Sequence, residues 1–246
     1  MTRIQQQIEQ HRQGEACIEI CDSTGRPLAG ISVWAEQESH EFTFGCVEPD
    51  LRSLSADDRE RCRARLAELF NRVVTADRPI DAGTSRVYVP AAANLGQFRA
   101  ELDRHSGVIE IWLDGPSIGL TGEIDAAAER RAAERAAELY SLGFAHPAVA
   151  GIIWDRFSGD SGLLRPDFAP RLAYRYLHKL IGTIWHSRAD GVTDSGGQFR
   201  FRSFFGDYRV AARIGDRPAV TTMFRHRRGA CLPGKLTMML RSERDR

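Results

Sequence analysis

Three side chains that could bind a sugar stand together at the end of one short apolar run. Trp154 ends the run, and Asp155 and Phe157 follow it. Aromatic faces can stack on a pyranose ring by covering its C–H surface, while a carboxylate accepts hydrogen bonds from hydroxyl groups. Asp77 and Asp114 are two further acidic residues that could serve as hydrogen-bond acceptors. Each has a structural alternative: Trp154 could pack beneath the loop, Asp155 could cap it, and Asp114 could begin an Asp-Gly-Pro turn.

The elements around these residues predict a parallel α/β arrangement. A helix ends near Gly143, the apolar run 149–154 is short enough for a buried strand, and a polar loop follows. A second helix is expected from about Asp167, because apolar residues recur there at helical spacing: Leu172, Tyr176, Leu180 and Ile184. Since such folds bind ligands beyond the carboxyl ends of their strands, the loop after residue 154 is the predicted site.

The same segment resembles the last strand–helix unit of family 10 glycoside hydrolases, the endo-β-1,4-xylanases. The matches stand at the family's fixed offsets and comprise Phe144, His146, Pro147, Ala148, Val149, Gly151, Ile152, Trp154, Leu164, Pro170, Ala173, Tyr174, Leu177, Leu180, Ile181 and Trp185. Residues 40–46 are similar to the family's first strand, and residues 69–74 to its entry into the second. The resemblance implies a TIM-type (β/α)8 barrel acting on a xylan-like polysaccharide, with Trp154, Asp155, Phe157 and Asp77 on the sugar.

The residues that this family uses for catalysis are missing at their expected places. The string that holds its acid/base Glu does not occur, and Leu113 falls where its nucleophilic Glu should stand, one residue before Asp114. Asp77 begins a segment that replaces the family's sugar-holding Asn and Lys-Trp pair. The resemblance therefore implies a reduced or inactive hydrolase, with Asp114 as the remaining catalytic candidate. The alternatives are a non-catalytic carbohydrate-binding or interaction module, and a hydrolase with relocated carboxylates at Asp114, Asp155 and Asp77.

Both chain ends predict short strands. Alternation at Ile18 and Ile20, a Gly turn, and alternation from Ile31 to Ala35 predict a hairpin. This stretch and residues 193–210 resemble the two halves of a carboxypeptidase-regulatory-like β-sandwich. We therefore expect an α/β fold in which an incomplete (β/α)8 barrel, residues 39–189, is inserted into a small β-sandwich made of residues 15–38 and 190–240. Two hairpins that pack separately are the alternative. An incomplete barrel has open sheet edges, which predicts self-association.

Composition excludes several classes of function. The 246 residues are 42% hydrophobic and 27% charged with a net charge of +1, so neither nucleic acid nor a membrane surface is an expected partner. The polar N-terminus has no signal-peptide core, which predicts a cytoplasmic protein unless an upstream signal is missing. The five cysteines lack CxxC spacing, so we expect them to be buried reduced thiols. No cofactor or metal site is predicted.

Overall fold

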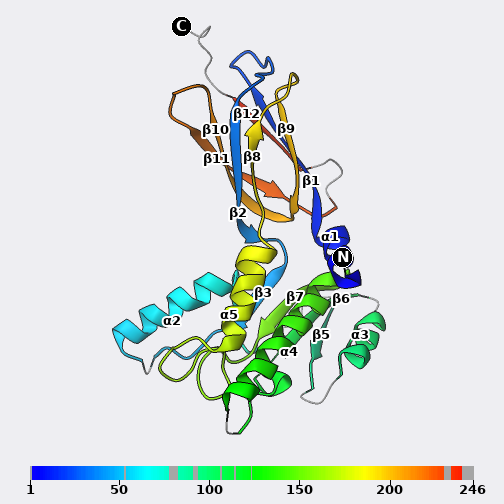
Figure 1. Cartoon of the computed structure of the whole chain (residues 1–246), viewed down its shortest axis with the longest axis vertical. Helices are drawn as coiled ribbons and strands as arrows, with labels where there is room; N and C mark the ends of the chain where they lie inside the picture. The colour runs from blue at the N-terminus through cyan, green and yellow to red at the C-terminus, as the bar shows by residue number, and fades with distance from the viewer. Residues whose placement is uncertain are drawn as a thin grey trace. The chain divides into compact units, whose positions relative to one another are not determined.

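The computed structural model describes residues 2–52, 54–77, 83–90, 94–105, 107–113, 115–122, 124–229 and 234–239. The chain forms two compact units (Figure 1). The α/β unit consists of Met1–His11 and Phe42–Trp185, and the β unit consists of Arg12–Glu41 and His186–Arg246. The chain therefore passes from one unit to the other three times.

The α/β unit is built on a five-stranded, wholly parallel sheet with strand order β4-β3-β7-β6-β5. Its strands are β3 (Thr43–Val47), β4 (Arg72–Val74), β5 (Thr84–Tyr88), β6 (Val108–Leu113) and β7 (Val149–Trp154). The helices are α1 (Arg3–Arg12), α2 (Ala56–Leu69), α3 (Leu95–Asp103), α4 (Ala126–Ala145) and α5 (Leu172–Lys179), with a 3₁₀ turn at Pro116–Ile118 and a π-helical turn at Leu180–Ile184.

Polar side chains fix where three of these helices begin. Ser55 accepts a hydrogen bond from the backbone N–H of Asp58, and Asn94 and Asp125 make the corresponding bonds at α3 and α4. Each bond satisfies a backbone donor that has no partner inside the helix.

The helices cover one face of the parallel sheet, and Figure 1 shows α4 and α5 in front of it. Gly143 allows α4 to pack close against the sheet, because a Cβ at this position would lie 2.7 Å from Ile111 Cδ1 and 2.9 Å from Ile152 Cδ1. An aromatic cluster fills the same layer: the Trp185 ring lies 4.6 Å from that of Phe144 and 5.9 Å from that of Phe44. This layer is the core of the unit.

The β unit contains two sheets that share one core. A three-stranded sheet has the order β12-β1-β9, and a four-stranded sheet has the order β11-β10-β2-β8. Their strands are β1 (Gln13–Cys21), β2 (Ser32–His40), β8 (Arg188–Val192), β9 (Gln198–Phe204), β10 (Gly206–Arg213), β11 (Val220–His226) and β12 (Gly234–Met239). The shared core includes Ile18, Ile20, Val33, Ala35, Tyr208, Val210 and Phe224.

The expected hairpin between residues 18–20 and 31–35 is wrong. β1 pairs with β9 and β12, whereas β2 pairs with β8 and β10, so the two strands belong to different sheets. Both strands point alternate residues into the shared core, a pattern that a hairpin would also produce. Buried Thr193 holds the connection between them, because its hydroxyl donates to the Leu28 carbonyl (2.6 Å) and accepts from the Ile31 N–H (3.0 Å).

The expected fold class, an incomplete (β/α)8 barrel inserted into a small β-sandwich, is also wrong. The described residues form twelve strands in three sheets against five α-helices, and β8 to β12 follow one another without an α-helix between them. The parallel sheet is open, with β4 and β5 as its two edges. The sequence matches to family 10 glycoside hydrolases lie within single strand–helix units, so they carry information about local structure only. The number of sheets, and whether a sheet closes into a barrel, depends on pairing between distant strands, which no local pattern specifies.

The structure shows the state of four cysteines and the length and polarity of the described helices. Cys17, Cys21, Cys46 and Cys62 are buried reduced thiols that form no disulfide with described residues, as the spacing predicted, and Cys231 lies outside the described residues. None of the helices in the described ranges is both long and apolar enough to cross a bilayer.

His226 gives the β unit a predicted dependence on pH. The ring is 1% exposed, next to Phe205 and Phe224, and burial lowers its pKa from the ordinary 6.5. The unfolded chain therefore takes up a proton before the folded chain does, so the free energy of unfolding should decrease as the pH falls below 6.5. Urea unfolding at about pH 7.5 and about pH 5.5 measures this decrease. His226→Phe should reduce it, and an equal decrease in wild type and variant would contradict the assignment.

Candidate functional site

The carboxyl ends of the five parallel strands define the edge where the sequence predicted a site. At this edge the loops after β5, β6 and β7 are joined by hydrogen bonds. The Ser117 hydroxyl donates to the Val89 carbonyl, and the Asp155 N–H donates to the Leu113 carbonyl at 2.6 Å. The backbone at Gly115 lies so close to Ser161 that a Cβ would be 1.8 Å from the Ser161 carbonyl oxygen. These contacts position the ends of three strands relative to one another.

The predicted aromatic residues lie inside this edge and do not face solvent. Trp154 is fully buried, and its indole N–H donates to the Arg156 carbonyl at 2.6 Å. Phe157 is 2% exposed and packs against the rings of Phe70 and Tyr174. In this conformation neither residue presents a ring face to a sugar, and the packing alternative for Trp154 describes its position.

Of the predicted acidic residues, Asp77 and Asp155 do not lie together. Asp155 is half-buried at the end of β7, Asp77 is exposed after β4, and Asp114 lies outside the described residues. β3 stands between β4 and β7, so about 10 Å of sheet separates Asp77 from Asp155.

Glu110, inside β6, is a buried carboxylate of the same sheet, 7% exposed. In the strand register it is level with Gly151, so about 13 Å of strand separates it from Asp155. Retaining hydrolysis needs carboxyl groups about 5–5.5 Å apart, and inverting hydrolysis about 6.5–9.5 Å. Among the described residues, Glu110 and Asp155 therefore do not form a catalytic pair of either kind.

A group of residues that sequence reasoning missed lies on the sheet face opposite the α4 layer. Parallel pairing places Arg86 level with Glu110, and Tyr88 level with Trp112, on this face. The Arg86 guanidinium lies 4.0 Å from the centre of the Trp112 ring, and the Tyr88 ring lies 6.0 Å from it. Such a cation–aromatic contact holds both side chains in place. We call Arg86, Tyr88 and Trp112 the aromatic shelf.

The aromatic shelf has features of a binding surface. Tyr88 is 65% exposed, whereas Trp112 is 3% exposed. The indole N–H of Trp112 is buried without a hydrogen-bond partner among the described residues, which is unusual for a buried donor. Nothing in the sequence around Tyr88 distinguished an exposed aromatic ring from an ordinary residue of an edge strand.

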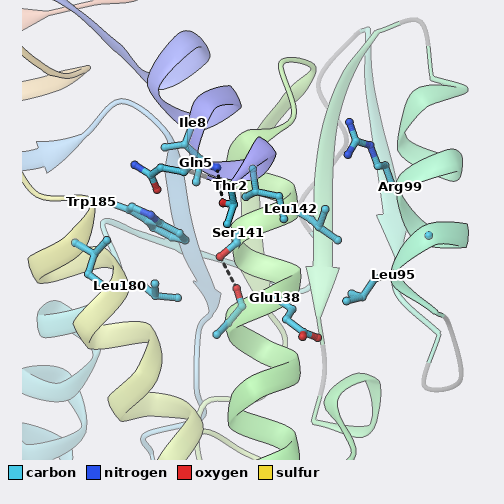
Figure 2. Close-up of a pocket in the computed structure, with 14 residues that line it drawn as sticks. Thr2, Gln5, Ile8, Leu95, Arg99, Glu138, Ser141, Leu142, Leu180 and Trp185 are labelled. Carbon is cyan, nitrogen blue, oxygen red and sulfur yellow. Dashed lines mark hydrogen bonds between the residues drawn. The ribbon is translucent and has the colours of Figure 1, made fainter.

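A cavity lies among the helices of the α/β unit, separate from the aromatic shelf. This cavity of about 550 Å³ is bordered by α1, α3, α4 and the π-helical turn (Figure 2). Its lining is mostly apolar, and the hydroxyls of Thr2 and Ser141 already bond to the helix backbone, as the dashed lines show. Its charged lining residues are Glu138 and Arg99, and we assign the cavity no chemistry.

Comparisons with known proteins add one local similarity. No family model matches the chain. The anti-sigma-I factor RsgI6 of Acetivibrio thermocellus is 33% identical over 93 residues, which cover 35% of this chain. The aligned part is only 12% of the length of that relative, so the similarity concerns a small part of a much longer protein.

Proposed function

We propose that the chain is a non-catalytic carbohydrate-binding protein whose α/β unit is related to family 10 glycoside hydrolases. The observation that carries this proposal is the exposed ring of Tyr88 beside the Arg86–Trp112 stack, on a sheet where Glu110 stands too far from Asp155 to form a hydrolytic pair with it. Tyr88 offers an apolar face together with a hydroxyl, and Arg86 adds hydrogen-bond donors. This combination suits a sugar ring.

The sequence resemblance indicates which carbohydrate to test first. The xylanase-like segments around residues 40–46, 69–74 and 144–185 favour a β-1,4-linked, xylan-like polysaccharide. Such a ligand is found outside the cell, which favours the secreted alternative over a cytoplasmic one. Self-association through the open edges β4 and β5 stays a prediction of the same proposal.

Replacing Tyr88 tests the proposal. Tyr88→Ala should weaken binding to soluble xylan by about tenfold, because aromatic stacking contributes about 1 kcal/mol or more. Affinity electrophoresis in xylan-containing gels measures the change, and assays for reducing sugar should detect no release by the wild-type protein.

The matched control is Tyr176→Ala. Tyr176 is 37% exposed on α5, in the helical layer, so its loss should leave migration in xylan unchanged. If wild-type protein is not retarded by xylan, or if both variants lose retardation equally, the aromatic shelf is not the binding site. Release of reducing sugar would show that the protein is an active hydrolase.

A further inference from the structure

The outer face of the four-stranded sheet in the β unit carries a tryptophan on the inner strand β2. Val33 and Ala35 of β2 point into the core, so Trp34, between them, points outward. The strand register places Trp34 between Asp190 of β8 and Ala211 of β10. Trp34 is the third residue of β2, and Ala211 is the third residue from the end of β10, so the position is near the end of this strand pair.

The Trp34 ring differs from the other three tryptophan rings in its surroundings. Trp112, Trp154 and Trp185 each lie against another aromatic ring. Within the described ranges the Trp34 ring makes no ring–ring or cation–π contact, and its indole N–H makes no hydrogen bond. The residues beside it are small, and together they border a hollow of about 450 Å³: Ser32, Gly191, Ala211 and Ala219. Trp34 is half-buried, and its small neighbours leave part of the ring exposed.

Polar groups with unused hydrogen-bonding capacity surround this ring. Asp190, Arg213 and Ser32 border the same hollow, and their side chains have no hydrogen bond or ion pair with described residues. Further along the same sheet face the charges are paired, Glu36 with Arg188 and Glu38 with Arg209. The available donors and acceptors are therefore gathered around the partly exposed indole, and one carboxylate and one guanidinium balance each other in charge.

We propose that the Trp34 face is a second binding site, which takes a neutral saccharide. A pyranose ring needs an aromatic plane for its C–H face and separate donors and acceptors for its hydroxyls. Trp34 supplies the plane, Asp190 an acceptor, and Arg213 and Ser32 donors. The balanced charge favours a neutral sugar over an anion, and the hollow has the size of a small-ligand site. This site lies on a different unit from Tyr88 and does not depend on the proposal made for the aromatic shelf.

The experiment uses the full chain in a Tyr88→Ala background, so that the two sites are separated. Titration calorimetry with xylohexaose and with cellohexaose should detect residual binding of at least one sugar. Trp34→Ala should weaken that binding by about tenfold or more, and Trp34→Phe, which keeps a ring, should weaken it less. Met223→Ala is the matched control, because Met223 is 54% exposed on the same sheet and should not affect the affinity.

A spectroscopic readout shows whether the sugar reaches the ring. In two-dimensional NMR the indole N–H signal that disappears in Trp34→Ala should shift when the hexasaccharide is added. The proposal is overturned if neither hexasaccharide binds in the Tyr88→Ala background, or if Trp34→Ala keeps the affinity within about twofold. It is equally overturned if Trp34→Ala changes only self-association, which would make the face a protein contact. Loss of binding in Trp34→Ala alone, with Tyr88→Ala unaffected, would refute the aromatic shelf and leave this site standing.

Discussion

Trp185→Ala should lower the free energy of unfolding of the α/β unit by about 3–5 kcal/mol. Trp185 is 1% exposed and follows the π-helical turn, where its backbone N–H donates to the Leu180 carbonyl at 2.8 Å. Its ring packs on those of Phe144 and Phe44, which lie on α4 and β3. Truncation would therefore remove contacts between the sheet and two helical segments at once, and would leave a cavity that rigid neighbours cannot fill.

Urea unfolding followed by circular dichroism measures this loss. Small domains are stable by about 5–15 kcal/mol in total, so the variant should lose a large share of its stability and unfold at a clearly lower urea concentration. Ile184→Ala is the matched control, because Ile184 is 50% exposed one residue earlier and its truncation should change the stability by less than about 1 kcal/mol. Equal midpoints for Trp185→Ala and Ile184→Ala would mean that the aromatic cluster is not the core of the unit.

The elements of the α/β unit could be predicted because their signals are local. The run 149–154 is strand β7 with the predicted bounds. The second helix was expected from about Asp167 but begins only at Leu172, after a loop in which Phe168 adopts a positive φ of 62°. Helix-period apolar residues located the helix, whereas nothing local indicated where the preceding loop would end.

The sheet pairing and the candidate sites could not be predicted in the same way. β1 and β2 both show alternation, yet alternation is the same for partners in one sheet and for strands that face each other across a core. Trp154 was favoured as a site residue because it ends a strand, but whether a ring at that position is buried depends on the loop that covers it. Tyr88 and Trp34 were missed because exposure on a sheet face is set by the size of cross-strand neighbours, such as Ala211, that are distant in sequence.

Gly115→Ala is the second substitution with a large expected effect, and it connects the fold to the aromatic shelf. A Cβ at Gly115 would lie 1.8 Å from the carbonyl oxygen of Ser161 and 2.7 Å from its carbonyl carbon, so the loop after β7 would have to move. Overpacking of this kind costs about 1–3 kcal/mol, and a clash with backbone cannot be relieved by a rotamer change. The 3₁₀ turn that begins at Pro116 should move with it, and Ser117 of this turn holds the Val89 carbonyl next to Tyr88.

We therefore expect Gly115→Ala to lower both the free energy of unfolding and the affinity for xylan, although residue 115 belongs to neither proposed binding surface. Urea unfolding and affinity electrophoresis on the same preparation measure the two effects. Gly182→Ala is the control, since a Cβ at Gly182 meets no atom within 4 Å and its φ is not positive, so this change should be neutral or slightly stabilising. If Gly115→Ala weakens xylan binding without loss of stability, the Val89–Ser117 contact acts directly on the position of Tyr88. If it changes neither quantity, the close approach between Gly115 and Ser161 does not fix this edge of the sheet, and the geometry argued for the aromatic shelf fails with it.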